Sequence, residues 1–134
     1  MNKPETNLNI LLKNMNPILN QGDYVFCTVE NIDNFNMKNV LGTFKEKEGT
    51  TLIISKEYAD LLGLTYTSIM SWISLEIHSS LEAVGLTAAF SKLLAENNIS
   101  CNVVAGYYHD HIFVLKKDAE KAISLLNSLQ IHSF

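Results

Sequence analysis

Hydrophobic positions follow two periods along the chain, one typical of helices and one typical of strands. Leu8, Leu11, Leu12 and Met15 recur at helical spacing and predict a short amphipathic helix, which Pro17 should end. Runs rich in β-branched and aromatic residues predict strands. We place the strands at residues 24–29, 41–45, 50–55, 69–77, 99–105 and 111–115.

Helical spacing returns in three further segments. Residues 56–62 predict a short helix that Gly63 should terminate. A longer helix carries Leu86 and Phe90 on one face and should stop at Asn97-Asn98, and a last helix is expected over 117–129. A final short strand is expected at 131–134.

The order of these elements indicates the fold. Strand 69–77 alternates, with Ile73, Leu75 and Ile77 expected on the core side. From there the order is β-α-β-β-α with a possible last strand, which is the ferredoxin-like arrangement. The first half repeats that order with its first helix shrunken to a polar loop at 31–39. We therefore predict an α+β, ferredoxin-like βαββαβ sandwich in tandem, with units at 1–67 and 68–134.

Composition and charge narrow the class of protein. A hydrophobic content of 47% is too high for a disordered chain. The net charge of -4 and the scattered basic residues argue against nucleic-acid binding. The sequence has no apolar run near the ~20 residues of a membrane helix and no signal-peptide pattern, so we expect a cytoplasmic protein without a membrane partner. Cys27 and Cys101 lie in strand patterns and are expected to be buried thiols.

The polar turn from His78 to Gly85 is the leading candidate site. Ser79 and Glu82 have the spacing of a capping box, which needs no ligand. The glycine is better explained by a helix that begins beside it, since peptide N–H groups at a helix start can bind a carboxylate. Capping alone and ligand binding both remain open on local chemistry.

A second polar cluster lies at Tyr107 to His111. His109 and His111 fall on the same side of a strand, with Asp110 between them. A zinc site needs three or four ligands, and neither of the other histidines lies at a motif spacing. No nucleophile accompanies a His–Asp pair. We therefore expect no metal, no cofactor and no catalytic residue, with a metal protein or enzyme kept as the lesser alternative.

Residues 82–114 resemble a known family. The stretch VGLTAAFSKLLAENNISCNVVAGYYHDHIFV is similar to the ACT domain of the aspartate-kinase type. With YVFCTV, TFKEKEGTTLII and WISLEIHSSLEAVGLTAAFS, nearly the whole chain resembles small stand-alone bacterial proteins with two tandem ACT-like units. Where the family often has Asp-Arg-Pro-Gly at the helix start, this chain has Glu82 to Gly85 as Glu-Ala-Val-Gly.

The resemblance implies a non-enzymatic regulatory module that binds an amino acid at an interface between two ACT units. It implies self-association, most simply as a homodimer, and action through a partner protein. An ACT-like protein that only associates and binds no ligand is the alternative. Carried over by position, the ligand-binding residues are His78, Ser79, Ser80, Val84, Gly85 and Leu86 in the loop, and Ser100, Cys101, Asn102 and Val103 in the strand.

Overall fold

The structure is a computed structural model that describes residues 8–77 and 85–132, and side chains as far as residue 129. The chain forms two compact units. One, the inserted unit, is residues 21–71. The other, the discontinuous unit, joins residues 1–20 to residues 72–134. Each unit has its own hydrophobic core.

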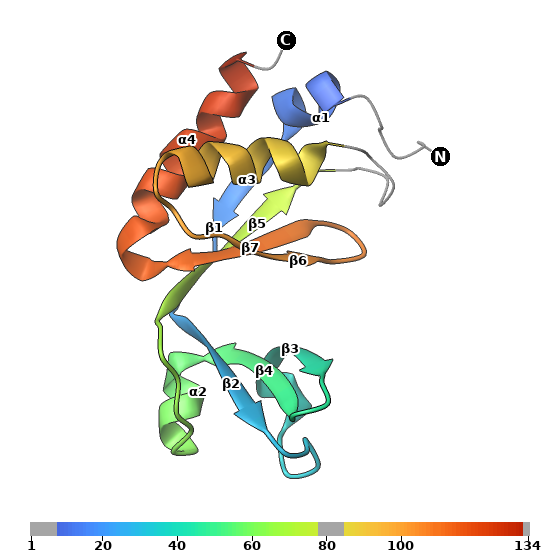
Figure 1. Cartoon of the computed structure of the whole chain (residues 1–134), viewed down its shortest axis with the longest axis vertical. Helices are drawn as coiled ribbons and strands as arrows, with labels where there is room; N and C mark the ends of the chain where they lie inside the picture. Colours follow the sequence, from blue (N-terminus) through green and yellow to red (C-terminus); the bar gives the residue numbers. More distant parts are fainter. Residues whose placement is uncertain (1–7, 78–84, 133–134) are drawn as a thin grey trace. The chain divides into compact units, whose positions relative to one another are not determined.

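The inserted unit is a small sheet with one short helix. Its elements are β2 (Tyr24–Val29), the 3-10 turn η1 (Met37–Asn39), β3 (Val40–Lys45), β4 (Thr50–Ser55) and α2 (Lys56–Leu61). The strands lie in the order β3-β4-β2, all antiparallel (Figure 1). The start of β5 continues the sheet, because Tyr24 pairs with Met70. The core consists of Val25, Cys27, Leu52, Ile54 and Ala59.

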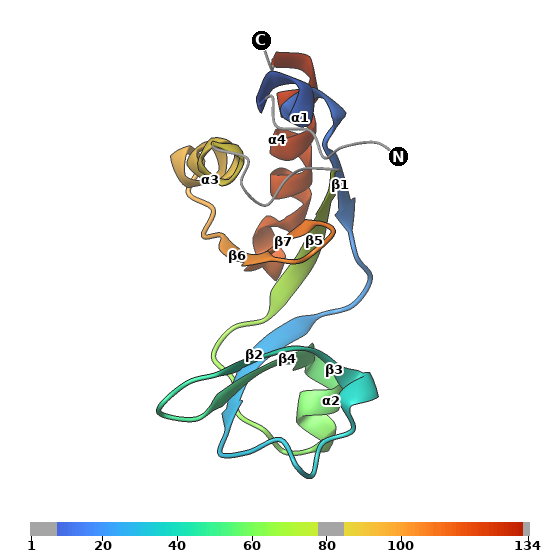
Figure 2. The same ribbon diagram turned by 90° about the vertical axis from the view of Figure 1, so that its right-hand side faces the viewer.

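The discontinuous unit is larger. Its elements are α1 (Leu8–Asn14), β1 (Asn16–Leu19), most of β5 (Met70–Glu76), α3 (Leu86–Glu96), β6 (Asn102–Ala105), β7 (Asp110–Leu115), the 3-10 turn η2 (Lys116–Asp118) and α4 (Ala119–His132). The strand order is β1-β5-β7-β6. The helices α1, α3 and α4 lie together on one face of this sheet (Figures 1 and 2).

The predicted alternation of β5 is confirmed. Ile73, Leu75 and Ile77 are almost fully buried in the core under the helices. Phe90 and Leu94 of α3 bury their side chains in the same core. The helix then ends where two asparagines were expected to end it, since Asn98 adopts a φ of 62°, the left-handed conformation that asparagine tolerates.

Two expectations about strands are wrong. Residues 131–132 continue α4 and do not form a strand. The place beside β5 is filled by β1, which pairs with it from Asn16↔Glu76 to Leu19↔Ile73. In the sequence, Pro17 predicts only the end of the preceding helix, but proline is also tolerated in an edge strand. The strand expected from residue 99 also begins later, at Asn102.

Both units share the ferredoxin-like strand order. In the inserted unit, β2 lies between β4 and the start of β5, with β3 outside β4. In the discontinuous unit, β5 lies between β7 and β1, with β6 outside β7, so β1 takes the place of the fourth strand although it comes first along the chain. In the inserted unit the first crossover is a loop with η1, as the polar segment predicted. The chain is therefore an α+β tandem fold. The sequence units at 1–67 and 68–134 remain a prediction. In the structure, residues 1–20 belong to the same compact unit as residues 72–134.

Candidate functional site

The predicted ligand loop is only partly described. His78, Ser79, Ser80 and Val84 lie outside the described residues. Helix α3 begins at Leu86 with Gly85 as its N-cap, so the N–H groups of the first turn start at Leu86. The carbonyl of Gly85 accepts a hydrogen bond from the Ala89 N–H at 2.9 Å.

Gly85 has a structural role of its own. Its φ is 94°, in the left-handed region that residues with a side chain rarely adopt. A Cβ there would lie 3.2 Å from Cδ2 of Leu8. The backbone conformation of this turn therefore explains why residue 85 is a glycine, whether or not a ligand binds there. Leu86 buries its side chain in the core, so a ligand could meet only its backbone.

The strand half of the predicted site is fully described. Ser100 and Asn102 are exposed, and the amide of Asn102 donates to the Phe113 carbonyl at 3.4 Å. Cys101, in the strand half of the site, packs against the hydrophobic core that contains Leu86, in the loop half. The two halves of the predicted site therefore border the same core. Burial raises the pKa of the Cys101 thiol to about 11, so the group stays protonated at neutral pH. Val103 is partly exposed on β6.

His111 of β7 belongs to a hydrogen-bonded network that no sequence pattern indicated. The indole N–H of Trp72 donates to Nδ1 of His111 at 3.0 Å, and the Ser74 hydroxyl lies 3.2 Å from the same nitrogen. The amide of Asn20 donates to that hydroxyl at 2.9 Å. Because Nδ1 accepts the hydrogen bond from the indole N–H, it carries no proton, and His111 is neutral with its proton on Nε2. The network ties β7 to β5 and to the segment after β1.

Burial around this network favours the neutral state of His111. It lowers the pKa of His111, and the charge of His109 lowers it further, whereas the charge of Asp110 raises it. Burial also raises the pKa of Asp110. Among the described residues no group of three or more His, Cys, Asp or Glu side chains is placed to hold a metal ion. The geometry suits a structural contact.

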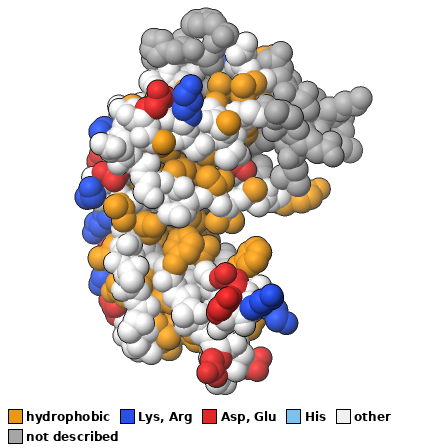
Figure 3. All heavy atoms as spheres, viewed as in Figure 1, with side chains coloured by type: hydrophobic (Ala, Val, Ile, Leu, Met, Phe, Trp, Pro, Cys, Tyr) orange, Lys and Arg blue, Asp and Glu red, His pale blue; other side chains and the backbone are white. Residues whose placement is uncertain are grey.

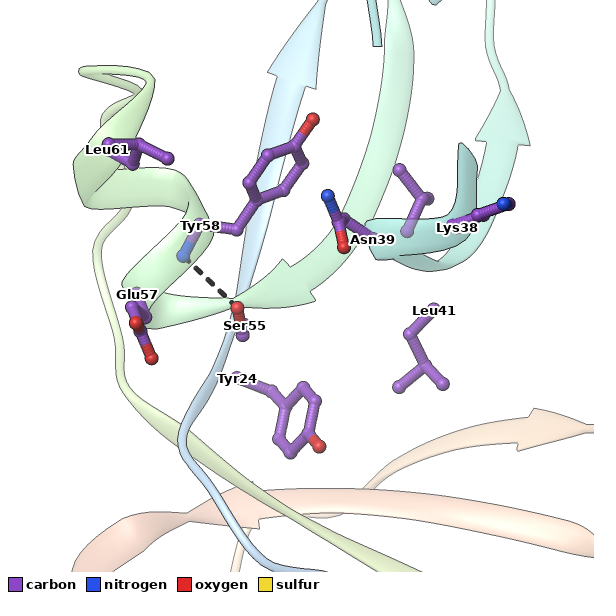
Figure 4. Close-up of a pocket in the computed structure, with 9 residues that line it drawn as sticks. Tyr24, Lys38, Asn39, Leu41, Ser55, Glu57, Tyr58 and Leu61 are labelled. Carbon is purple, nitrogen blue, oxygen red and sulfur yellow. Dashed lines mark hydrogen bonds between the residues drawn. The ribbon is translucent and has the colours of Figure 1, made fainter. Parts of the chain in front are cut away.

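The inserted unit also contains a hollow that the sequence did not predict. It has a volume of about 500 Å³, within the range of small-molecule pockets. It lies beside the three-residue turn η1, which occupies the connection from β2 to β3 where the other unit has α3. Figure 4 shows Lys38 and Glu57 on opposite sides of it, and the Ser55 hydroxyl accepting from the Tyr58 N–H. Its other lining residues are Tyr24, Asn39, Val40, Leu41 and Leu61.

The basic side chains of the protein are poorly suited to the recognition of polyanions. The ten basic residues of the chain are all lysines, without the arginine that reads bases and phosphates bidentately. On the face shown in Figure 3, lysines are interspersed with acidic side chains. Within the described ranges, no helix is long and apolar enough to cross a membrane.

Comparisons with known proteins agree with this architecture. Two ACT-domain family profiles match, one over residues 3–71 and one over residues 67–128. A solved Vibrio cholerae protein of unknown function, described as a possible transport protein, is 48% identical with a TM-score of 0.84, covering 92% of this chain and 95% of that chain.

More distant structures share the fold. The regulatory subunit of Thermus thermophilus aspartate kinase has a TM-score of 0.58 at 8% identity, covering 84% of this chain and 95% of that chain. Escherichia coli aspartokinase III, solved with aspartate and ADP, has a TM-score of 0.62 at 10% identity, covering 87% of this chain and 33% of that chain. No curated protein matches. The chain therefore belongs to the ACT-domain family and carries two ACT-type domains in tandem.

Proposed function

We propose that the protein is a non-enzymatic regulatory module that senses an amino acid and acts on a partner protein. The observation that carries this is the pair of ACT-domain matches, which together span residues 3–128. ACT domains are regulatory, and two structural neighbours are aspartate kinases or their regulatory subunit. The module would work in the cytoplasm as a homodimer.

The ligand would sit at the start of α3 and the start of β6. The free N–H groups of the first turn of this 11-residue helix, from Leu86, would hold the carboxylate with help from the helix dipole. Ser100 and Asn102 are exposed and would add side-chain hydrogen bonds. The loop residues His78, Ser79, Ser80 and Val84 belong to the same proposed site, as do Gly85, Cys101 and Val103.

A thermal-shift screen of the pure protein against the twenty amino acids tests the proposal. A ligand present at about 100 times its dissociation constant adds roughly 2.7 kcal/mol to the free energy of unfolding. For a domain of this size we expect the melting temperature to rise by several degrees, which titration calorimetry would then convert into an affinity. No shift with any amino acid would contradict amino-acid sensing.

A charge substitution locates the site. Ser100→Glu places a carboxylate at an exposed position beside the proposed ligand carboxylate, and we expect the affinity to fall at least about tenfold from like-charge repulsion. Thr43→Glu, at an exposed position on β3, is the matched control and should bind normally. Equal affinities in both variants would place the ligand elsewhere, and the hollow at Lys38 and Glu57 would be tested next.

The alternative is an ACT protein that only associates. The specific observation in its favour is β6, whose residues are all exposed, followed by two exposed tyrosines. This reading predicts self-association together with a flat ligand screen. A Gly85→Val substitution would not separate the two readings, because the positive φ of Gly85 and its closeness to Leu8 make the change destabilising in either case.

A further inference from the structure

The hollow of the inserted unit does not correspond to the amino-acid site proposed above. That site follows the end of β5, and the equivalent of β5 in the inserted unit is β2, so the equivalent position comes after Val29. The hollow instead lies at the opposite end of this strand, where Tyr24 begins β2 and Ser55 ends β4. Every residue that lines it belongs to the inserted unit. The hollow is therefore a second candidate site with its own chemistry.

Hydrogen bonds hold the walls of the hollow in place. The Asn36 N–H donates to the Tyr58 hydroxyl at 3.4 Å, which ties the residue before η1 to α2. The Asn36 side chain accepts from the Lys38 N–H at 3.1 Å and caps η1, and Ser55 caps α2. These bonds form without a ligand, so a ligand would meet walls that are already ordered, which lowers the entropic cost of binding.

Opposite charges stand on opposite sides of the hollow. Lys38 lies on the η1 side and Glu57 on the α2 side (Figure 4). Both side chains are exposed and rotatable, so each can turn its charge over the mouth of the hollow. In the described part of the chain, neither forms an ion pair. Between them, the amide of Asn39 points toward the α2 side, and the Ser55 hydroxyl, which accepts from the Tyr58 N–H, retains a proton to donate.

The rest of the lining is apolar or aromatic. Leu61 is 79% exposed and Leu41 is 40% exposed, although both are large hydrophobic side chains. The rings of Tyr24 and Tyr58 lie between them and the sheet. Because covering apolar surface is favourable in water, the hollow suits a ligand that carries apolar side chains as well as two charges.

We propose that the hollow binds a dipeptide with apolar side chains, its carboxylate at Lys38 and its ammonium group at Glu57. The two charges of an α-amino acid are attached to one carbon and cannot reach opposite sides. An extended chain gains about 3.3–3.6 Å of reach with each residue, so a dipeptide separates its charges. Its peptide group would lie beside Asn39, whose amide offers both a donor and an acceptor. The proposal goes beyond amino-acid sensing and does not depend on it.

Capped peptides test each end of the proposed ligand. Leucyl-leucine should bind the full chain in titration calorimetry. N-acetyl-leucyl-leucine lacks the ammonium group and leucyl-leucine amide lacks the carboxylate, and each should bind about fivefold more weakly, the upper end for a charge pair in contact with solvent. Equal affinities for the three peptides, or no binding of leucyl-leucine, would overturn the proposal.

Two substitutions assign the peptide ends to residues. Glu57→Gln should bind the free and acetylated peptides equally, and Lys38→Gln should bind the free and amidated peptides equally, because each variant lacks the charge that recognises that end. Glu30→Gln and Lys45→Gln are the matched controls, since both positions are exposed on the same unit and neither lines the hollow. The controls should keep both preferences of the wild type.

A variant of the other site separates the two proposals. Ser100→Glu should leave the affinity for leucyl-leucine unchanged, since Ser100 belongs to the discontinuous unit. Loss of dipeptide binding in Ser100→Glu, or peptide preferences that survive in Glu57→Gln and Lys38→Gln, would overturn the dipeptide site. A protein that binds leucyl-leucine with these preferences and no amino acid would support the dipeptide site and contradict amino-acid sensing.

Discussion

At the scale of single residues, the least expected feature is the bond between Trp72 and His111. It fixes the tautomer of a half-buried histidine through an indole that can only donate. Protonation of His111 would place a second N–H against that of Trp72. The contact therefore couples the stability of the β5–β7 pair to pH.

We predict that stability falls as the pH drops below about 6.5, the ordinary pKa of histidine. Burial and the His109 charge lower the pKa of His111 in the folded state. Between the lowered pKa and the ordinary one the unfolded chain binds more protons, so the free energy of unfolding rises with pH in that window. Urea unfolding from pH 5 to pH 8 measures this slope.

His111→Gln is the control for that slope. The glutamine oxygen can still accept from the Trp72 indole, but the side chain does not titrate. The variant should show a shallower dependence on pH than the wild type over the same range. Identical profiles for the two proteins would show that His111 does not contribute to the pH dependence.

At the scale of elements, the short helix α2 depends on its cap. It is six residues long, too short to be stable on its own propensity, and its one fully buried side chain is Ala59. The Ser55 hydroxyl accepts from the Tyr58 N–H at 3.1 Å and satisfies one free donor of the first turn. The surface pair Lys56–Asp60 adds little by comparison.

Ser55→Ala should therefore lower the free energy of unfolding by about 1 kcal/mol. The matched control is Ser91→Ala inside α3, where the hydroxyl only donates back to the Thr87 carbonyl of its own helix. That change should be neutral or slightly stabilising, because alanine is the better helix former. Chemical denaturation of the two variants gives the comparison, and equal losses would contradict a capping role.

At the scale of the whole molecule, one of the two compact units is built from two segments that are separated along the sequence. Residues 1–20 belong to the compact unit formed with residues 72–134, and the segment between them forms a unit of its own. Leu11 of α1 is 1% exposed in the larger core, and Leu52 of β4 is 0% exposed in the smaller one. A matched pair of substitutions can therefore address the units separately.

Leu11→Ala and Leu52→Ala should each cost about 2–5 kcal/mol, the usual range for a buried leucine. The two substitutions should destabilise different parts of the chain. Hydrogen exchange measured by mass spectrometry should show faster exchange in residues 72–129 for Leu11→Ala, and in residues 24–55 for Leu52→Ala. If Leu11→Ala instead loosened β2 and β4, helix α1 would belong to the inserted unit in solution.

The sequence by itself determined most elements and the faces they bury. The alternation of Ile73, Leu75 and Ile77 and the stop at Asn98 are local signals, because periodicity and turn chemistry act over a few residues. The family resemblance supplied the tandem fold, which the two ACT-domain matches confirm. The residues proposed to bind a ligand came from that resemblance, and four of the six in the loop lie outside the described residues.

Tertiary structure alone decided which distant segments meet. The β1–β5 pairing joins residues about 60 positions apart, and a four-residue strand containing Pro17 shows no alternation of hydrophobic and polar residues that would predict it. The Trp72–His111 bond and the hollow beside η1 likewise depend on how strands are ordered, which local patterns do not encode. Strand order is set by long-range burial and backbone pairing, so the open edge at β6 became visible only once every neighbour was placed.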